Sequence, residues 1–191
     1  FSGADYPLPI VSGNVSFYNQ STGGKAIPPS PIVAVFGKIH DHRKATDIVL
    51  RKEGNLILLV GTRKDELGGS LFYRTCLGHQ GGTVPVFRGS LEKRMADWVL
   101  GVIHDNRAYS AHDISVGGLA VAGAEMALAS GKLGVKFSLD SNPVSLFSET
   151  PGYLLEVDPH FVENVTLPEF VSLAGTVCSG SSVSGKGWSV D

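Results

Sequence analysis

Apolar residues gather in short runs separated by glycine, proline and serine, and these runs predict strands. Residues 55–61, "NLILLVG", form a continuous apolar run that ends in glycine, which is typical of a strand buried on both faces. Near the N-terminus two stretches are expected to be strands joined by a loop that "PPSP" keeps extended. These two stretches are residues 10–20 and 31–39. The other expected strands are residues 108–115, 134–139, 152–157 and, as the last one, 170–177.

A helical pattern is clearest over residues 90–107. Ser90 is expected to be the N-cap, and Glu92 lies in the first turn. Apolar side chains recur at the spacing of one helix face, which predicts an amphipathic helix packed on the core. Those apolar residues are Leu91, Met95, Trp98, Val99, Val102 and Ile103.

Three further helices are expected. Residues 116–130 are rich in Ala and Gly, which favours a helix packed closely against a sheet or another helix. A short helix is expected to begin near Ser70. Residues 158–165 have the form of a helix start, with Asp158 as N-cap and Pro159 at the first helical position.

The order of these elements predicts two units. Strands alternate with helices over residues 55–177, which indicates an α/β or α+β fold. Residues 1–40 contain only strands and loops, and the charged stretch 40–54 is expected to link them to the second unit, with "DIVL" packing locally. The two expected units are therefore residues 1–40 and residues 41–191. The tail after residue 177 is expected to be flexible or to lie at an edge of the sheet.

Composition narrows the class of partner. The chain has 191 residues, 42% of them hydrophobic, with a formal net charge of −2. That balance excludes binding to nucleic acid or anionic lipid through a basic surface, so small molecules or proteins are expected as partners. The chain contains no run of about 18 apolar residues, so no membrane-spanning helix is expected. Cys76 and Cys178 are expected to be buried free thiols in a reducing cytoplasm.

The chain begins on Phe1, and "FSGADYPLPI" has neither the basic nor the apolar region of a signal peptide. We therefore expect it to be a fragment of a longer protein.

One stretch could carry chemistry on spacing alone. "SAHDISVGGLA" places His112 and Asp113 before a Ser-x-Gly-Gly that opens a helix. Free N–H groups at that end could hold a phosphate, with Asp113 holding its magnesium. Alternatively, Asp113 and Ser115 cap the helix and the glycines allow close packing, and spacing alone favours this second interpretation.

Three other stretches are open to two interpretations each. Glu149, in "LFSETPG", could bind a cation or hydroxyl, or lie in a solvated turn. The glycines of "KDELGGS" (64–70) could cradle an anion or only join a loop to a helix. "HDH" (40–42) could be half of a metal site, but a solvated linker is favoured because no third ligand has suitable spacing.

Taken in order, these stretches resemble the second half of the phosphoribosylformylglycinamidine synthase large-subunit family, within the aminoimidazole ribonucleotide synthetase superfamily. The resemblance covers nearly the whole chain, and "GNVSFYN" is its most specific part, while the other motifs are shared across the superfamily. The stretches that carry it are "SGNVSFYNQ", "PSPIVAVFGKI", "TRKDELGGS", "SLEKRMADWVLGVI", "SAHDISVGGLAVAGAEMA" and "LFSETPG".

The resemblance implies a fold and an activity. Residues 1–40 would be the last strands of the second N-terminal-type, ATP-binding domain, and residues 41–191 the second C-terminal-type α/β domain. The family is an ATP-dependent C–N ligase of purine biosynthesis. It uses ATP and Mg²⁺ to activate formylglycinamide ribonucleotide as an iminophosphate, which ammonia converts to the amidine. A glutaminase subunit supplies the ammonia in a cytoplasmic complex with a small accessory subunit.

The resemblance also implies site residues. Gly13 corresponds to an ATP-contacting position, Asn14 to a magnesium ligand and Ser16 to a substrate contact. Each type suits its role, because glycine lets the backbone approach phosphate, an amide oxygen is a hard ligand and a hydroxyl can bond a ribonucleotide oxygen. The family's catalytic histidine belongs to the missing N-terminal half, so no residue here is catalytic and the fragment alone is expected to be inactive.

Asp113 and Glu149 would line a pseudo-symmetric auxiliary site. The sequence departs from the family there, since Val116 stands in place of Asp and no Arg follows Gly152, while Gln20 replaces the usual Glu. The first two changes remove one charge of each sign near the same site, which favours a degenerate, non-catalytic pocket. Two alternatives stay open: a non-catalytic nucleotide-binding or assembly module, and another superfamily member such as aminoimidazole ribonucleotide synthetase, against which "GNVSFYN" argues.

Overall fold

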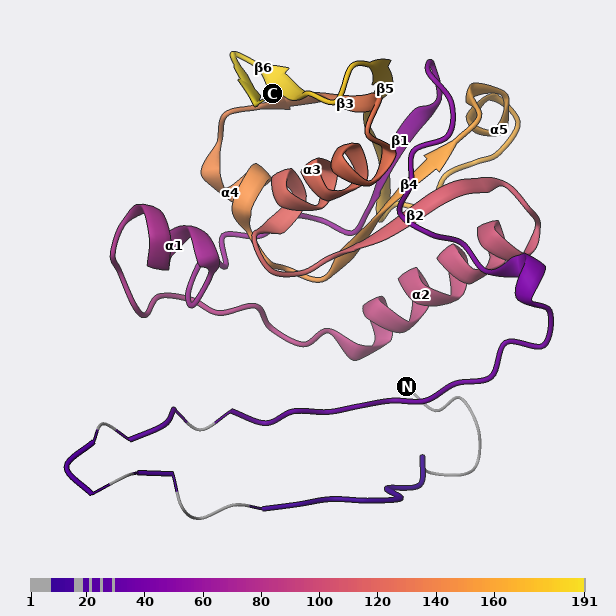
Figure 1. Ribbon diagram of the computed structural model, residues 1–191. Helices are drawn as coiled ribbons and strands as arrows, with labels where there is room; N and C mark the ends of the chain where they lie inside the picture. The colour runs from indigo at the N-terminus through magenta and orange to yellow at the C-terminus, as the bar shows by residue number, and fades with distance from the viewer. Residues whose placement is uncertain (1–7, 16–18, 21, 25, 29, 191) are drawn as a thin grey trace. The chain divides into compact units, whose positions relative to one another are not determined.

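The computed structural model of the protein describes residues 8–15, 19–20, 22–24, 26–28 and 30–190. The chain divides into two units, Phe1–His40 and Asp41–Asp191, which are described separately. Figure 1 shows the course of the chain through both.

The first unit is extended, and none of its described residues belongs to a strand or helix. The two strands expected over 10–20 and 31–39 are therefore absent from the part the structure describes; residues 16–18 lie outside it. Large apolar side chains are exposed there, with Ile10 92%, Ile32 94% and Phe36 91% accessible. A strand forms only when a neighbour supplies a ladder of hydrogen bonds. Asn19 O accepts a hydrogen bond from Ile27 N–H at 2.7 Å, but no such ladder forms among the described residues of this unit.

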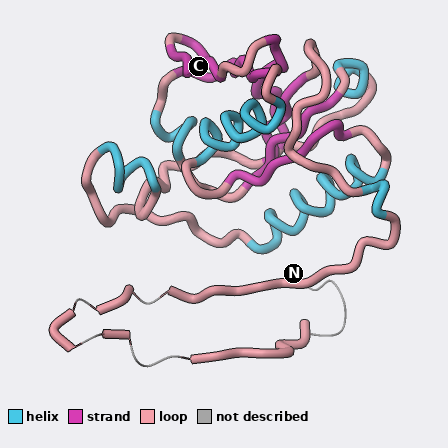
Figure 2. Tube along the Cα trace, in the orientation of Figure 1, coloured by secondary structure: helices cyan, strands magenta, loops and turns pink. Residues whose placement is uncertain are grey.

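The second unit is built on one seven-stranded sheet with the strand order β2-β4-β1-β5-β3-β6-β7. Of the six strand pairings, only β3 with β6 is parallel. Figure 2 shows the strands together with the helices around them. The strands are β1 (Leu56–Val60), β2 (Ala108–Ile114), β3 (Leu133–Asp140), β4 (Gly152–Val157), β5 (Val171–Ser179), β6 (Val183–Lys186) and β7 (Trp188–Val190).

Helices lie on both faces of this sheet (Figure 1). The two longest are α2 and α3, and a 3-10 helix, η1 (His42–Lys44), begins the unit. The helices are α1 (Leu71–Cys76), α2 (Gly89–His104), α3 (Gly118–Ser130), α4 (Pro143–Phe147) and α5 (Pro159–Glu163).

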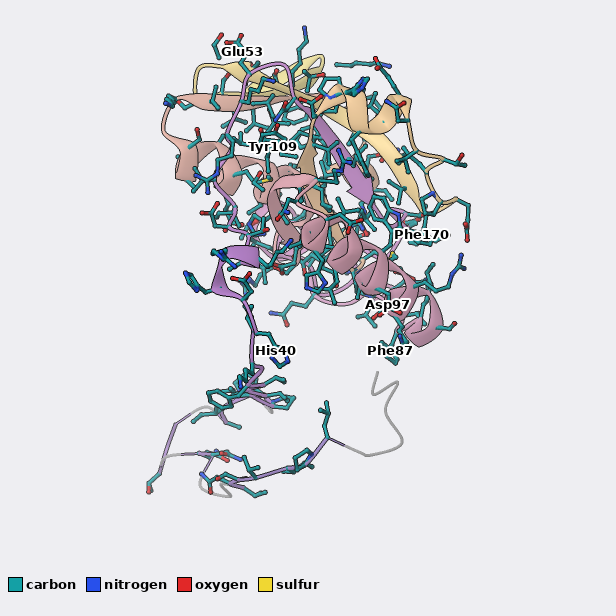
Figure 3. All side chains as sticks on the ribbon, turned by 90° about the vertical axis from the view of Figure 1, so that its right-hand side faces the viewer. His40, Glu53, Phe87, Asp97, Tyr109 and Phe170 are labelled. Carbon is teal, nitrogen blue, oxygen red and sulfur yellow. The ribbon has the colours of Figure 1, made fainter. Side chains whose placement is uncertain are left out.

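Strand β1 is buried on both faces, as its continuous apolar run predicts. Ile57 and Leu59 join the core cluster that contains α3, whereas Leu58 and Val60 join the cluster that contains α2. Figure 3 shows Phe170, a member of the α2 cluster, beside that helix. Because successive side chains of a strand point to opposite faces, one short apolar run supports two helix layers.

The expected face of α2 is confirmed, but its N-cap is not Ser90. Met95, Val99 and Val102 are buried, and Leu91, Trp98 and Ile103 pack against the same cluster. The helix begins at Gly89, and the N-cap is Arg88, whose backbone N–H donates to Glu92 Oε1 at 2.8 Å. Glu92 reaches back across the first turn as in half of a capping box, so the helix starts before Ser90.

The N-cap Asp158 is confirmed, and the short helix expected near Ser70 begins at Leu71 with Ser70 as its N-cap. Ser70 accepts a hydrogen bond from the backbone of Tyr73, and Asp158 accepts one from His160. Helix α4 is a short element that the sequence analysis missed, although Asn142 caps it and Pro143 occupies its first turn. Strand β5 is not the last strand, because the tail continues as β6 and the edge strand β7.

The expected linker is part of the second unit. Leu50 is buried in the α3 cluster, and Ile48 packs against it, which confirms the local packing of "DIVL". The backbone N–H groups of Arg51 and Lys52 both donate to Glu156, whose side chain is fully buried on β4. Residues 47–55 are therefore fixed to the sheet.

Both cysteines are free, as expected, but Cys76 is exposed and Cys178 is only partly buried. The expected burial is wrong for Cys76 because α1 has only six residues and none of them is buried. Within the described part of the chain, no helix is long and apolar enough to cross a membrane.

Candidate functional site

The stretch that carries the most specific resemblance lies in the extended first unit. Gly13 and Asn14 are exposed, and nothing lies within 4 Å of the position that a Cβ on Gly13 would take. Ser16 lies outside the described residues. The described part of the chain contains no group of three or more His, Cys, Asp or Glu side chains that could hold a metal ion. Asn14 alone therefore does not make a magnesium site, and further oxygen ligands must come from elsewhere.

Glu149 lies at a junction between two helices of the second unit. Its Oε1 accepts hydrogen bonds from the backbone N–H of Leu71, at the start of α1, and of Gly117, just before α3, each at 2.8 Å. A solvated turn, one of its two expected roles, is therefore wrong. The Gly117 N–H that could have held a phosphate already has a carboxylate partner from the chain itself.

The glycines before α3 serve close packing. A Cβ on Gly118 would lie 2.7 Å from Phe147 Cα, so only glycine allows α3 to approach the end of α4 this closely. The N-cap is Gly117 in a left-handed conformation, without a side-chain cap. The expectation that Asp113 and Ser115 cap this helix is wrong, whereas the packing role is confirmed.

Asp113 lies at the end of β2, opposite Tyr153 of β4. Its side chain is 65% exposed, and its Oδ1 is 3.3 Å from Nδ1 of the adjacent His112. The His112 ring is held from the other side by Glu125 of α3, at 2.9 Å from Nε2. Burial, helped by the charge of Asp113, raises the pKa of Tyr153. Val116, which replaces an expected Asp, is exposed.

Arg63, which the sequence analysis did not single out, lies beneath the loop that carries Glu149. Its guanidinium donates to the backbone carbonyls of Ser148, Thr150 and Pro151, at 3.3, 2.5 and 3.1 Å. Burial lowers the pKa of Arg63 to about 10, and the charge of Glu66 opposes that shift. The group still carries its full charge at neutral pH.

Glu66 anchors the same loop from a second side. It forms an ion pair with Arg88, and its Oε2 accepts a hydrogen bond from Thr150 Oγ1 at 2.9 Å. The hydrogen bonds from Arg88 hold the pKa of the Glu66 carboxyl below its usual range. The sequence contains this glutamate inside "KDELGGS", but local pattern gives no sign of partners 22 and 84 residues away.

The glycine pair of "KDELGGS" is a loop-to-helix junction. Gly68 N–H donates to Thr83 O at 2.7 Å, and Gly69 N–H donates to Gly81 O at 3.2 Å. These two amides are therefore not available to cradle an anion.

In "HDH", Asp41 pairs with Arg43 and caps η1. Among the described residues, these side chains belong to no group of three or more His, Cys, Asp or Glu that could hold a metal ion.

Comparison with known proteins gives one family match and several relatives. Residues 52–166 match the model of the C-terminal domain of AIR synthase related proteins. "Phosphoribosylformylglycinamidine synthase subunit PurL" of Alkaliphilus metalliredigens is 40% identical over 161 residues, covering 82% of this chain and 22% of that protein. The protein of the same name from Methanothrix thermoacetophila is also 40% identical, covering 88% of this chain and 22% of the relative.

Solved structures share the fold. Thermotoga maritima PurL complexed with FGAR superposes with a TM-score of 0.61 at 18% identity, covering 74% of this chain and 27% of that one. Escherichia coli HypE, a hydrogenase maturation protein, superposes with a TM-score of 0.54 at 17% identity, covering 77% of this chain and 52% of HypE. The mixed α/β fold expected from the resemblance is confirmed. The chain thus belongs to the family of AIR synthase related proteins, whose C-terminal domain residues 52–166 match, and within it to the phosphoribosylformylglycinamidine synthase PurL family.

Proposed function

We propose that this chain is the C-terminal part of a phosphoribosylformylglycinamidine synthase large subunit. One observation carries the proposal: identity of 40% over 82% of the chain with a protein of that name. The "GNVSFYN" stretch, the most specific part of the resemblance, supports it. Because the chain covers only 22% of that relative, the activity is that of the longer protein.

Residues 1–40 are, in this proposal, the last strands of an ATP-binding domain, and residues 41–191 are the C-terminal-type domain. The exposed apolar residues of the first unit support it. Ile32, Val33, Val35 and Phe36 expose side chains from adjacent positions, which suits a strand with both faces covered in a complete domain. The rest of that domain would come from the missing N-terminal half of the protein.

The reaction is the ATP-dependent conversion of formylglycinamide ribonucleotide and ammonia to the amidine. ATP, with Mg²⁺, supplies the phosphoryl group that activates the formamide oxygen. Gly13 contributes backbone that a phosphate can approach, since no Cβ blocks it. Asn14 contributes an amide oxygen to the magnesium ion, and Ser16 a hydroxyl to the substrate. The catalytic residue belongs to the missing half.

The proposed partners follow from the same assignment. Ammonia comes from a glutaminase subunit, a small accessory subunit completes the complex, and the complex works in the cytoplasm. Thermotoga maritima PurL has been solved in complex with FGAR and in complex with ATP, which supports these two substrates for the proposed enzyme.

A chimera tests the proposal. Residues 1–191 replace the matching segment of the Alkaliphilus metalliredigens protein, and amidine formation and ADP release are measured with ammonia as nitrogen donor. We expect an active chimera, a loss of at least about 100-fold in Asn14→Ala, and no loss in the control Asn164→Ala, an exposed amide on another element. Turnover by the isolated chain, or an unaffected Asn14→Ala chimera, would contradict the proposal.

The alternative of a nucleotide-binding module predicts a different result. It requires micromolar binding of MgADP to the isolated chain that Asp113→Ala abolishes. The Gly117 N–H already bonds Glu149, which argues against phosphate binding there.

A further inference from the structure

The guanidinium of Arg63 lies in a slot that two glycines leave open. A Cβ on Gly152 would lie 2.5 Å from Arg63 Nη2, and one on Gly61 would lie 3.4 Å from the same atom. The three carbonyls that the guanidinium bonds belong to residues 148, 150 and 151. These carbonyls belong to the residue before Glu149 and to the two residues after it, so the cation fixes the backbone on both sides of the glutamate.

The side chains next to Glu149 are fixed as well. Ser148 Oγ and Thr150 Oγ1 are 2.8 Å apart, and Thr150 donates to the buried carboxylate of Glu66. Both hydroxyl-bearing residues are buried. Because the residues on either side are held, the Glu149 side chain has little freedom to move away from the two N–H groups that donate hydrogen bonds to it.

We propose that Arg63 is the positioning residue that holds Glu149 against the backbone N–H groups of Leu71 and Gly117. The carboxylate then joins the starts of α1 and α3. This inference concerns the C-terminal domain alone and does not depend on the proposed synthase activity.

The inference also revises an expectation. By the family pattern, the Arg that is missing after Gly152 implies the loss of a positive charge near the auxiliary site that Asp113 and Glu149 would line. Arg63 supplies a cation beside Gly152 from a position 89 residues earlier, so that charge is present.

Amide hydrogen exchange, followed by NMR on the whole chain, tests the role. In Arg63→Met we expect the exchange rates of the Leu71 and Gly117 amides to rise at least about tenfold, as in Glu149→Gln. The double variant should exchange no faster than either single variant, because both remove the same contact. Arg63→Lys should recover part of the protection, since an ammonium can still reach one carbonyl.

The matched control is Arg94→Met, which removes an exposed ion pair with Glu169 on another part of the domain. It should leave both amides unchanged. If Arg63→Met lowered stability but left the Leu71 and Gly117 amides protected, or if the two single effects added, the proposal would be overturned.

A measurement on the unmodified chain guards against variants that do not fold. The Nη protons of Arg63 should be resolved and slowed in their exchange with solvent, as expected for a partly buried guanidinium bonded to three carbonyls. A single averaged Nη signal in fast exchange would equally overturn the proposal.

Discussion

Glu156 should be the side chain whose replacement most destabilises the domain. It is fully buried in β4, and its carboxylate accepts four hydrogen bonds, none of them from a cation. The donors are Arg51 N–H and Ser110 Oγ to Oε2, each at 2.9 Å, and Lys52 N–H at 2.9 Å and Asn55 Nδ2 at 2.7 Å to Oε1. Glu156→Leu keeps a similar volume but leaves all four donors without an acceptor.

The size of the loss follows from which donors water can reach. The N–H groups of Arg51 and Lys52 belong to exposed residues and can turn to solvent, whereas Asn55 and Ser110 are fully buried. An orphaned buried donor costs about 1–3 kcal/mol, so two of them predict a loss of about 2–6 kcal/mol in the free energy of unfolding. Since the free energy of unfolding of a small domain is about 5–15 kcal/mol, a loss of this size should bring Glu156→Leu close to unfolding.

Urea denaturation followed by far-UV circular dichroism measures this loss. Adding Ser110→Ala to Glu156→Leu should restore about 1 kcal/mol or more, because removing an unpaired donor removes its cost. The control Glu163→Gln changes an exposed carboxylate and should stay within about 0.5 kcal/mol of the unmodified chain. If Glu156→Leu were as stable as that control, the account of the buried carboxylate would be refuted.

Two further predictions concern glycine packing and pH. Gly152→Ala should lower the free energy of unfolding by about 1–3 kcal/mol, because its Cβ would lie 2.5 Å from Val60 O and Arg63 Nη2. The matched control Gly101→Ala, in α2 with nothing within 4 Å of its Cβ, should raise the free energy of unfolding by about 0.5–1 kcal/mol. A higher denaturant midpoint for Gly152→Ala than for Gly101→Ala would contradict this packing argument. The pKa of Glu66 is lowered in the folded state, so the ionised Glu66 side chain contributes to the free energy of unfolding. This contribution is fully present above the unfolded-state pKa of about 4.3 and is lost as the pH falls through the folded-state pKa. The stability advantage of the unmodified chain over Glu66→Gln, measured from pH 7 to pH 2, should therefore be largest at neutral pH and vanish in acid; an advantage that grew in acid would rule the reasoning out.

The sequence alone determined the elements whose signals are local. The apolar run of β1, the one-sided pattern of α2, the helix start near Ser70 and the cap Asp158 each depend on residues close together in the chain, and all are confirmed. The order of several motifs also identified the family. Such features follow from strand and helix periodicity and from capping chemistry, which a single stretch carries by itself.

Only the tertiary structure decided what the polar residues do. Glu149 bonds N–H groups 78 and 32 residues away, Arg63 bonds carbonyls 85 to 88 residues away, and Glu156 accepts from donors up to 105 residues away. No local pattern contains such partners, because strand order and loop packing bring them together. For the same reason, residues 10–20 and 31–39 have strand composition but form no strand among their described residues: a strand needs a neighbour that its own sequence does not supply.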